Sequence, residues 1–420
     1  MKSGFFFLLF FLLNLSPSYS IISMEQVSSF SNITTMDYST SIDIEGDYAY
    51  ITGFNTASLA IIDFSDKSNP RQVGYFINRS SLDGAWYIDV DTKGDYAYIG
   101  GDGGNNLYNG SLISGLVILN VTNKSNPYQV SILADMDDIY SLKISDKGYG
   151  NLIYLTSQQQ GYLYIINVTD KKNPGKLGNI SISRARSVVV DDKGGYAYVG
   201  TNDNIPNNIT EDYVYIINIS NKTNPINITN LNNFIFFDLQ AIYLEGDYIY
   251  TSAWPRDDLT ITNIKDKKHP YIQTIFKHPA IYGVMDLRAH NDMVYMASEY
   301  ANSVVIINVS NKDNPVLIGH FCNTTSLYYP YEIEIAGDFI HLASKFGNSY
   351  TILKMSQGDG DLPLYNNSRC YNERPTENRV GQAIPDFDIT KFLIDNTPKI
   401  THPSKKTFFS RWLDRLMFWK

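Results

Sequence analysis

Cysteine is nearly absent from this sequence, which has only Cys322 and Cys370 among its 420 residues. The two do not form a CxxC pair, so neither a redox motif nor a zinc site is predicted. Basic residues nowhere gather into a stripe, and the net charge is −9, which argues against a nucleic-acid partner. The six histidines lack metal-ligand spacing, and no Gly-rich segment leads into the Lys-Ser/Thr of a phosphate loop. We therefore expect neither a metal nor a cofactor.

Long hydrophobic runs are missing too. The apolar stretch Phe5–Leu13 is far shorter than the roughly 20 residues that span a bilayer. Lys2 precedes this stretch, and the small residues Ser18 and Ser20 follow it. This order predicts a signal peptide over residues 1–20, with an uncleaved anchor as the alternative. The protein is therefore expected to be secreted or held at the cell surface.

Export would expose the chain to glycosylation and to oxidation. Many Asn-x-Ser/Thr triplets occur, and the best acceptor candidates are those in predicted loops: Asn78, Asn109, Asn208 and Asn323. In an oxidising compartment Cys322 and Cys370 are expected to form a disulfide, although two unpaired thiols remain the alternative.

Aromatic residues are abundant, with 32 tyrosines and 21 phenylalanines, and such a composition favours β-strands. The phrase VVIINVSNKDNP at 304–315 recurs in variants along the chain. Its turn prolines are Pro70, Pro127, Pro174, Pro225, Pro270 and Pro315. Two predicted strands precede each apolar run, as in Ile42–Ile44 and Tyr48–Ile51, and a fourth strand follows the proline. A unit of four short strands over about 45 residues is typical of a propeller blade.

A seventh unit begins at Tyr331 and ends at Met355 without a fourth strand. Near the other end of the chain, Glu25–Phe30 reads like the fourth strand Arg71–Phe76. We therefore predict an all-β fold, a seven-bladed β-propeller over residues 21–355, closed by an N-terminal strand that covers the open sheet edge.

The strand Leu116–Val121 and its relatives ending in Asn-Pro resemble the LVIVD repeat, over roughly Met24 to Met355. The resemblance implies a seven-bladed propeller in an exported or cell-surface protein, and it carries over no catalytic residues. The chain departs from the family's name at the end of this strand, where Asp63 is acidic but the other units have asparagine, as in Asn120.

Aligning the blades places residues of the innermost strands at one end of the central channel: Trp86, Tyr87, Tyr140, Arg186, Gln240, Asp286, Tyr331 and Glu332. Loops at the same end add Phe54, Trp254, Tyr300 and Phe346. Aromatic residues with a few polar groups suit a ligand pocket, but the same residues would also plug the channel. Insertions at 101–112 and 201–212 lie on this face, where repeat proteins often bind partners. The Gly-rich start of the first insertion is expected to be a flexible loop, with weak calcium binding as the alternative.

Residues 356–404 predict an irregular arm, and residues 405–420 an amphipathic helix. The face formed by Thr407–Lys420 suits a membrane surface or a protein partner equally well. The favoured function is an exported, glycosylated, non-catalytic propeller that binds a protein or glycan partner. One alternative is a secreted hydrolase or lyase using Asp286 and Glu332 at the channel mouth. Another is a structural component of the cell envelope.

Overall fold

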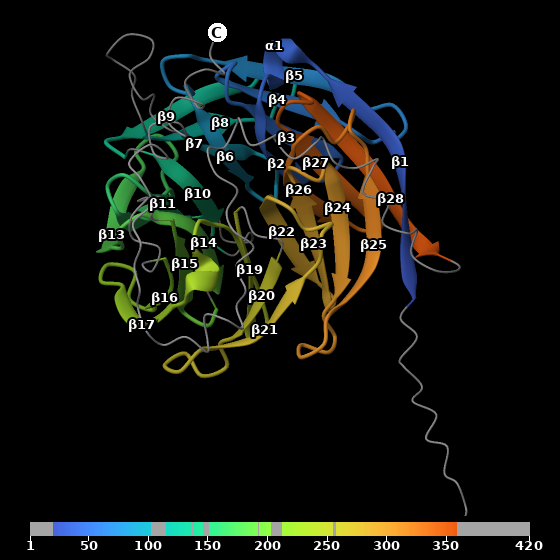
Figure 1. Ribbon diagram of the computed structural model, residues 1–420. Coiled ribbons are helices and arrows are strands. Elements are labelled where there is room, and N and C mark those ends of the chain that lie inside the picture. Colours follow the sequence, from blue (N-terminus) through green and yellow to red (C-terminus); the bar gives the residue numbers. More distant parts are fainter. Residues whose placement is uncertain are drawn as a thin grey trace, which may run out of the picture.

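The fold is described by a computed structural model over residues 20–101, 115–136, 138–145, 151–191, 193–202, 212–254 and 258–358. Within these residues, seven four-stranded antiparallel sheets follow one another around a ring (Figure 1), which confirms the predicted propeller. Most of the signal segment, most of both insertions, Asn109, Asn208, Cys370 and the whole C-terminal tail lie outside the described residues.

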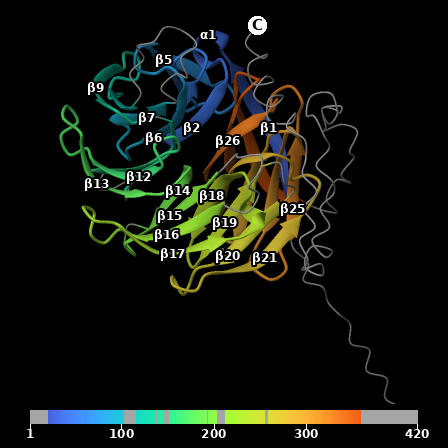
Figure 2. The ribbon, with the colours of Figure 1, turned by 60° about the vertical axis from the view of Figure 1, so that its left-hand side comes forward.

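In blades 1 to 6 the four strands follow the chain from the channel outward, whereas blade 7 takes its outer strand from the N-terminus. The innermost strands labelled in Figure 2 lie toward the middle of the ring. The innermost strands are β2 (Ser39–Glu45), β6 (Ala85–Val90), β10 (Ile139–Ile144), β14 (Ala185–Asp191), β18 (Leu239–Glu245), β22 (Val284–His290) and β26 (Pro330–Ala336). The second strands are β3 (Tyr48–Gly53), β7 (Tyr96–Gly101), β11 (Leu152–Ser157), β15 (Tyr196–Thr201), β19 (Tyr248–Ala253), β23 (Met293–Ser298) and β27 (Phe339–Ser344).

The third strands carry the recurring apolar run: β4 (Ser58–Asp63), β8 (Gly115–Asn120), β12 (Tyr162–Asn167), β16 (Tyr213–Asn218), β20 (Asp258–Asn263), β24 (Ser303–Asn308) and β28 (Ser349–Gly358). The outer strands are β5 (Arg71–Ile77), β9 (Tyr128–Ala134), β13 (Gly175–Ser181), β17 (Ile226–Asn232), β21 (Tyr271–Lys277), β25 (Val316–Cys322) and β1 (Ile21–Ser31). Two short helical turns, α1 (Ile33–Met36) and η1 (Phe234–Phe236), lie in connections between blades.

The N-terminal strand closes the ring as predicted. β1 pairs with β28 from Ile21 opposite Gly358 to Ser31 opposite Ser349, so the two ends of the propeller share blade 7 (Figure 1). The strand begins four residues before the predicted Glu25. The Gln26 Oε1 atom also accepts hydrogen bonds from Ser326 Oγ at 2.7 Å and Asn323 Nδ2 at 3.1 Å. These bonds tie the closing strand to the connection between blades 6 and 7.

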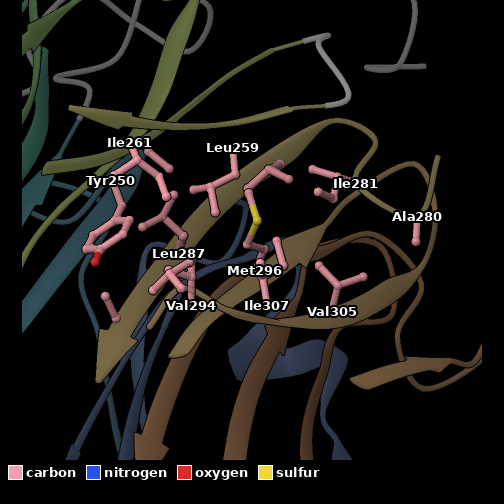
Figure 3. Close-up of a cluster of buried hydrophobic side chains, with 14 residues drawn as sticks. Tyr250, Leu259, Ile261, Ala280, Ile281, Leu287, Val294, Met296, Val305 and Ile307 are labelled. Carbon is pink, nitrogen blue, oxygen red and sulfur yellow. The ribbon is translucent and has the colours of Figure 1, made fainter. Parts of the chain in front are cut away.

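The hydrophobic core lies between neighbouring blades. Figure 3 shows the cluster between blades 5 and 6, where Leu259 and Ile261 of β20 meet Leu287 of β22 and Met296 of β23. The middle strands are buried on both faces because each sheet packs on a neighbour at either side. Their apolar runs are therefore continuous rather than alternating.

The repeated Asn or Asp at the end of the third strand in blades 1 to 6 forms a side-chain turn. Asp63 Oδ1 accepts from the Ser65 N–H at 3.0 Å, and Asn308 Oδ1 accepts from the Ser310 N–H at 2.9 Å. Because the bond needs only a side-chain oxygen two residues before the donor, an amide serves as well as a carboxylate. This explains why the chain departs from the family's acid without losing the turn.

The lysine of each of these turns contacts aromatic rings of the preceding blade. Lys124 Nζ donates to the Val121 carbonyl at 2.9 Å and lies 5.5 Å from the ring centre of Tyr48 and 5.6 Å from that of Tyr50 in blade 1. Equivalent contacts join Lys171, Lys222, Lys267 and Lys312 to tyrosines of the preceding blade. Each cation–π contact contributes on the order of 0.5–2 kcal/mol, so the recurring lysine helps to hold consecutive blades together.

Glycines of the outer strands allow this turn to approach closely. A Cβ atom on Gly178 of β13 would overlap the backbone carbonyl of Lys222 in the next blade, whereas a Cβ on Gly175 of the same strand meets nothing within 4 Å. We therefore expect Gly178→Ala to lower the free energy of unfolding by about 1–3 kcal/mol, since the blades must move apart.

The matched variant Gly175→Ala is expected to leave the free energy of unfolding unchanged or raise it by up to about 1 kcal/mol. Urea unfolding followed by linear extrapolation measures both. Equal effects of the two substitutions would contradict the close blade contact.

Candidate functional site: the central channel and its loop face

The innermost strand of every blade is a sheet edge that faces the channel. Its N–H groups therefore need partners from outside the sheet. Side chains of the preceding blade supply them. Asp43 Oδ2 accepts from the Val90 N–H at 2.7 Å, and Asp89 Oδ2 accepts from the Ile144 N–H at 2.8 Å. Further bonds of this type start at Ser41, Ser141, Asp286 and Glu332.

Arg288 gathers three carboxylates on the channel wall between blades 6 and 7. Its guanidinium donates to Asp286 at 2.6 Å, to Glu334 at 2.5 Å and to Glu332 at 3.3 Å. One guanidinium cannot neutralise three carboxylates, of which Glu332 is buried and Asp286 and Glu334 are partly buried. Burial, together with the nearby Asp286, accordingly raises the pKa of Glu332 to about 8. Burial also raises the pKa of Asp286, while Arg288 opposes the shift.

Aromatic rings line most of the channel mouth at the loop face, the end that carries the connections between second and third strands and between blades. We call this set the aromatic belt: Tyr38, Phe54, Trp86, Tyr140, Trp254, Tyr282, Tyr300, Tyr328, Tyr329, Tyr331 and Phe346. Its rings contact one another in sequence, for example Phe54 and Trp86 at 4.9 Å and Phe346 and Tyr329 at 4.8 Å between centroids. The contacts continue from Tyr329 through Tyr300 to Trp254.

A polar network fills the rest of the circle, at blades 3 to 5. The Arg186 guanidinium stacks 3.8 Å from the centre of the Tyr140 ring, and its Nη2 donates to Gln240 Oε1 at 2.8 Å. Its Nη1 lies 3.4 Å from Gln158 Oε1. Asp238 Oδ1 accepts from both Gln240 Nε2 and Asn202 Nδ2 at 2.6 Å. The mouth of the channel is thus aromatic over most of its circumference and polar on one side.

The structure brings together most of the residues predicted from the blade alignment. Trp86, Tyr140 and Tyr331 meet in the aromatic belt, and Phe54, Trp254, Tyr300 and Phe346 join it. Arg186 and Gln240 bond to each other. Asp286 and Glu332 lie one position further along their strands and share Arg288. Burial raises the pKa of the Tyr87 hydroxyl, and the positive charge of nearby Arg186 opposes this shift. Whether these residues bind a ligand stays a prediction.

Several mouth residues were missed, among them Tyr38, Tyr329 and Lys345. Tyr38 and Tyr329 stand directly before β2 and β26, two residues ahead of the aligned position that Tyr331 occupies in blade 7. The turn there has a positive φ: 62° for Tyr38 and 60° for Tyr329. Gly84, Asp238 and Gly283 occupy the same place in other blades with positive φ. Extending the alignment of the blades two residues toward the N-terminus would have identified both tyrosines as mouth residues. Lys345, whose Nζ lies 4.6 Å from the centre of the Tyr38 ring and 3.4 Å from Glu299, gives no such signal.

The remaining sequence predictions are only partly within the described residues. Asn78 and Asn323 begin connections on the loop face, after β5 and β25. Cys322 ends β25, while Cys370 lies outside the described residues, so the disulfide stays a prediction. In the part of the chain that the structure describes, no helix is long and apolar enough to cross a membrane. The same residues contain no cluster of three or more His, Cys, Asp or Glu side chains able to hold a metal ion.

The ring of seven sheets and its channel define the chain as a seven-bladed β-propeller. The LVIVD repeat model matches residues 38–77 and 284–324, which are blades 1 and 6. The chain therefore contains two matches to the LVIVD repeat within a seven-bladed propeller, which confirms the resemblance predicted from its sequence.

Two solved structures share the architecture. Hydrazine synthase of Kuenenia stuttgartiensis has a TM-score of 0.59 at 12% identity, over 78% of this chain and 98% of that chain. A functionally unknown protein of Desulfotomaculum acetoxidans DSM 771 has a TM-score of 0.51 at 14% identity, over 73% of this chain and 99% of that chain. At these identities the likeness shows the fold alone. No curated protein matches the sequence significantly.

The raised pKa of Glu332 predicts a pH dependence of stability. The folded state keeps a proton that the unfolded state loses as pH rises from about 4.5 to about 8, so this contribution to the free energy of unfolding falls over that range. Glu332→Gln retains an acceptor oxygen for the Ile42 N–H but cannot titrate. We expect the stability of this variant relative to the parent to rise between pH 5 and pH 8 by at least about 1.4 kcal/mol, the value of one pKa unit.

Urea unfolding at several pH values measures this difference, with Glu25→Gln on the exposed face of β1 as the control. Parallel curves for parent and Glu332→Gln would mean that Glu332 is ionised throughout, and would overturn the assignment.

Proposed function

We propose that this chain is an exported, glycosylated, non-catalytic propeller that binds a protein or glycan partner through its loop face, at the cell surface or outside the cell. The observation that carries the proposal is the aromatic belt. Tyr328 is 36% exposed, and Phe54, Trp86, Trp254 and Phe346 are partly exposed, all at one end of the channel. Aromatic side chains give large contact areas at low entropic cost and are enriched in binding interfaces.

Sequence features support the export part of the proposal. The pattern of residues 1–20 is that of a signal peptide, and Asn78 and Asn323 stand in sequons at the loop face. A Cys322–Cys370 disulfide would hold the start of the tail near blade 6, and the amphipathic segment Thr407–Lys420 would add contact with a membrane surface or a partner.

Hydrolase or lyase chemistry at the channel mouth is not favoured, because the two carboxylates it would use already have structural partners. Asp286 and Glu332 both contact Arg288, and each accepts a backbone N–H of the next blade. Glu332 is only 5% exposed. A structural role in the cell envelope would instead require self-association, which size-exclusion chromatography of the mature protein detects.

A pair of variants in blade 5 tests the loop face. Trp254 belongs to the aromatic belt, whereas Tyr271 is 52% exposed at the start of β21, at the opposite end of the ring. We expect Trp254→Ala to weaken binding of labelled mature protein to intact cells at least 10-fold, as for an interface hot spot of about 1.4 kcal/mol or more. Tyr271→Ala should change the apparent Kd less than twofold.

Flow cytometry over a concentration series measures this, and cells treated with glycosidase or protease distinguish a glycan from a protein partner. Equal affinities for the two variants, or loss of binding only with Tyr271→Ala, would contradict a partner on the loop face.

A further inference from the structure

Arg186 is a buried cation whose direct contacts are all neutral. Its side chain is 7% exposed, and it touches the amide oxygens of Gln158 and Gln240 and the ring of Tyr140. Its Nε atom is buried and has no hydrogen-bond partner among the described residues. A buried charge is normally compensated by an opposite charge in direct contact. Arg288 shows the usual solution in this molecule, since it contacts three carboxylates.

The nearest compensating carboxylate is engaged elsewhere. Asp238 Oδ1 accepts from Asn202 and Gln240, and the Gln240 amide in turn accepts from Arg186, so hydrogen bonds link Asp238 to Arg186 through Gln240. On the Gln158 side, the distance from Nη1 to Oε1 is 3.4 Å, at the long limit of a hydrogen bond. A charge-assisted bond to a carboxylate is shorter, at about 2.7–2.9 Å, and roughly twice as strong.

Gln158, which contacts Arg186, also lines a depression that offers space for a ligand. This depression of about 290 Å³ opens on the loop face between blades 3 and 4, with Gln158, Gln159 and Gly161 on one wall and Ser183 and Arg184 on the other. Gln159 and Ser183 are exposed there. The lining offers amide, hydroxyl and guanidinium groups, which match the hydroxyl groups of a sugar.

Charged groups around the channel mouth affect which ligands the depression favours. Lys345, the other cation near Tyr331, is paired with Glu299. Asp286, Glu332 and Glu334 share the positive charge of Arg288 at blades 6 and 7 and do not line the depression. Arg184 on the wall of the depression supplies a positive charge, so the lining favours an anion.

We propose that the depression between blades 3 and 4 binds an acidic sugar, a uronate or a sialate, whose carboxylate replaces the Gln158 amide as the partner of Arg186. The sugar ring fills the depression, with its hydroxyl groups on Gln159 and Ser183. The inference rests on the proposed function, because it names the chemical class of partner recognised at the loop face.

Isothermal titration calorimetry of the full mature chain tests the proposal with matched probes. D-glucuronate is expected to bind at least 10-fold more tightly than D-glucuronamide, in which a neutral amide replaces the carboxylate, and also more tightly than acetate, which lacks the ring. N-acetylneuraminate is measured as a second free sugar acid, and a uronate-terminated oligosaccharide as a glycan end. Comparing their affinities shows whether the site prefers a free sugar acid or the end of a glycan. Inorganic phosphate serves as the competing anion.

Two variants locate the site. Arg186→Gln is expected to weaken glucuronate binding at least 10-fold and to abolish the preference over glucuronamide, and Gln159→Ala to weaken it about threefold or more. Arg71→Gln removes an arginine whose side chain is 72% exposed on β5, and it should leave affinity within twofold. Thermal melting checks that each variant folds. If Arg186→Gln does not fold, the acid–amide comparison on the unmodified chain and Gln159→Ala still decide.

The proposal is overturned by equal binding of acid and amide, by unchanged affinity in Arg186→Gln, by binding of phosphate alone, or by no binding of any sugar acid at millimolar concentration. If sugar acids fail while cell binding remains sensitive to Trp254→Ala, this inference fails alone. If sugar acids do not bind and cell binding is also insensitive to Trp254→Ala, both this inference and the proposed function fail.

Discussion

The unpaired edge of the innermost strands is the constraint on which the rest of this propeller depends. Seven sheets arranged around an axis leave seven edges facing one narrow channel. Each N–H on those edges would cost about 1–3 kcal/mol if it were buried without a partner. The chain meets this cost with short polar side chains that reach sideways to the next blade, as Asp43 does to Val90. The channel wall is therefore polar and acidic for structural reasons.

That requirement separates the structural carboxylates from the groups available for recognition. Arg288 and its three carboxylates seal the junction between blades 6 and 7. Arg186, at the second position of β14, stands at the mouth instead, and its direct contacts are two amides and a ring. Two buried arginines on strands of the same type thus have different surroundings, and only Arg186 retains a donor without a partner.

The two ends of the ring also differ in what they allow. The end of the ring opposite the loop face carries the turns between third and outer strands. There the geometry of one blade against the next is fixed by the side-chain turns at Asp63 and Asn308, by the lysine–tyrosine contacts and by the close packing of Gly178. A substitution there disturbs several contacts at once. Connections at the loop face contribute single side chains to the aromatic belt, so they can change without loosening the ring. Recognition is therefore expected at the loop face.

The sequence by itself determined the number of blades, the closing strand, the turn chemistry and most of the residues at the channel mouth. Each depends on local periodicity: strand alternation, a polar turn before Pro315 and the same register in every blade. Local patterns do not say which side chains of different blades touch. The sharing of Arg288 by Asp286 and Glu332, the contact of Lys345 with Tyr38, and the neutral surroundings of Arg186 arise only when the ring closes. Tertiary structure decided these because they join residues that are far apart in the sequence and are brought together by the curvature of the whole propeller.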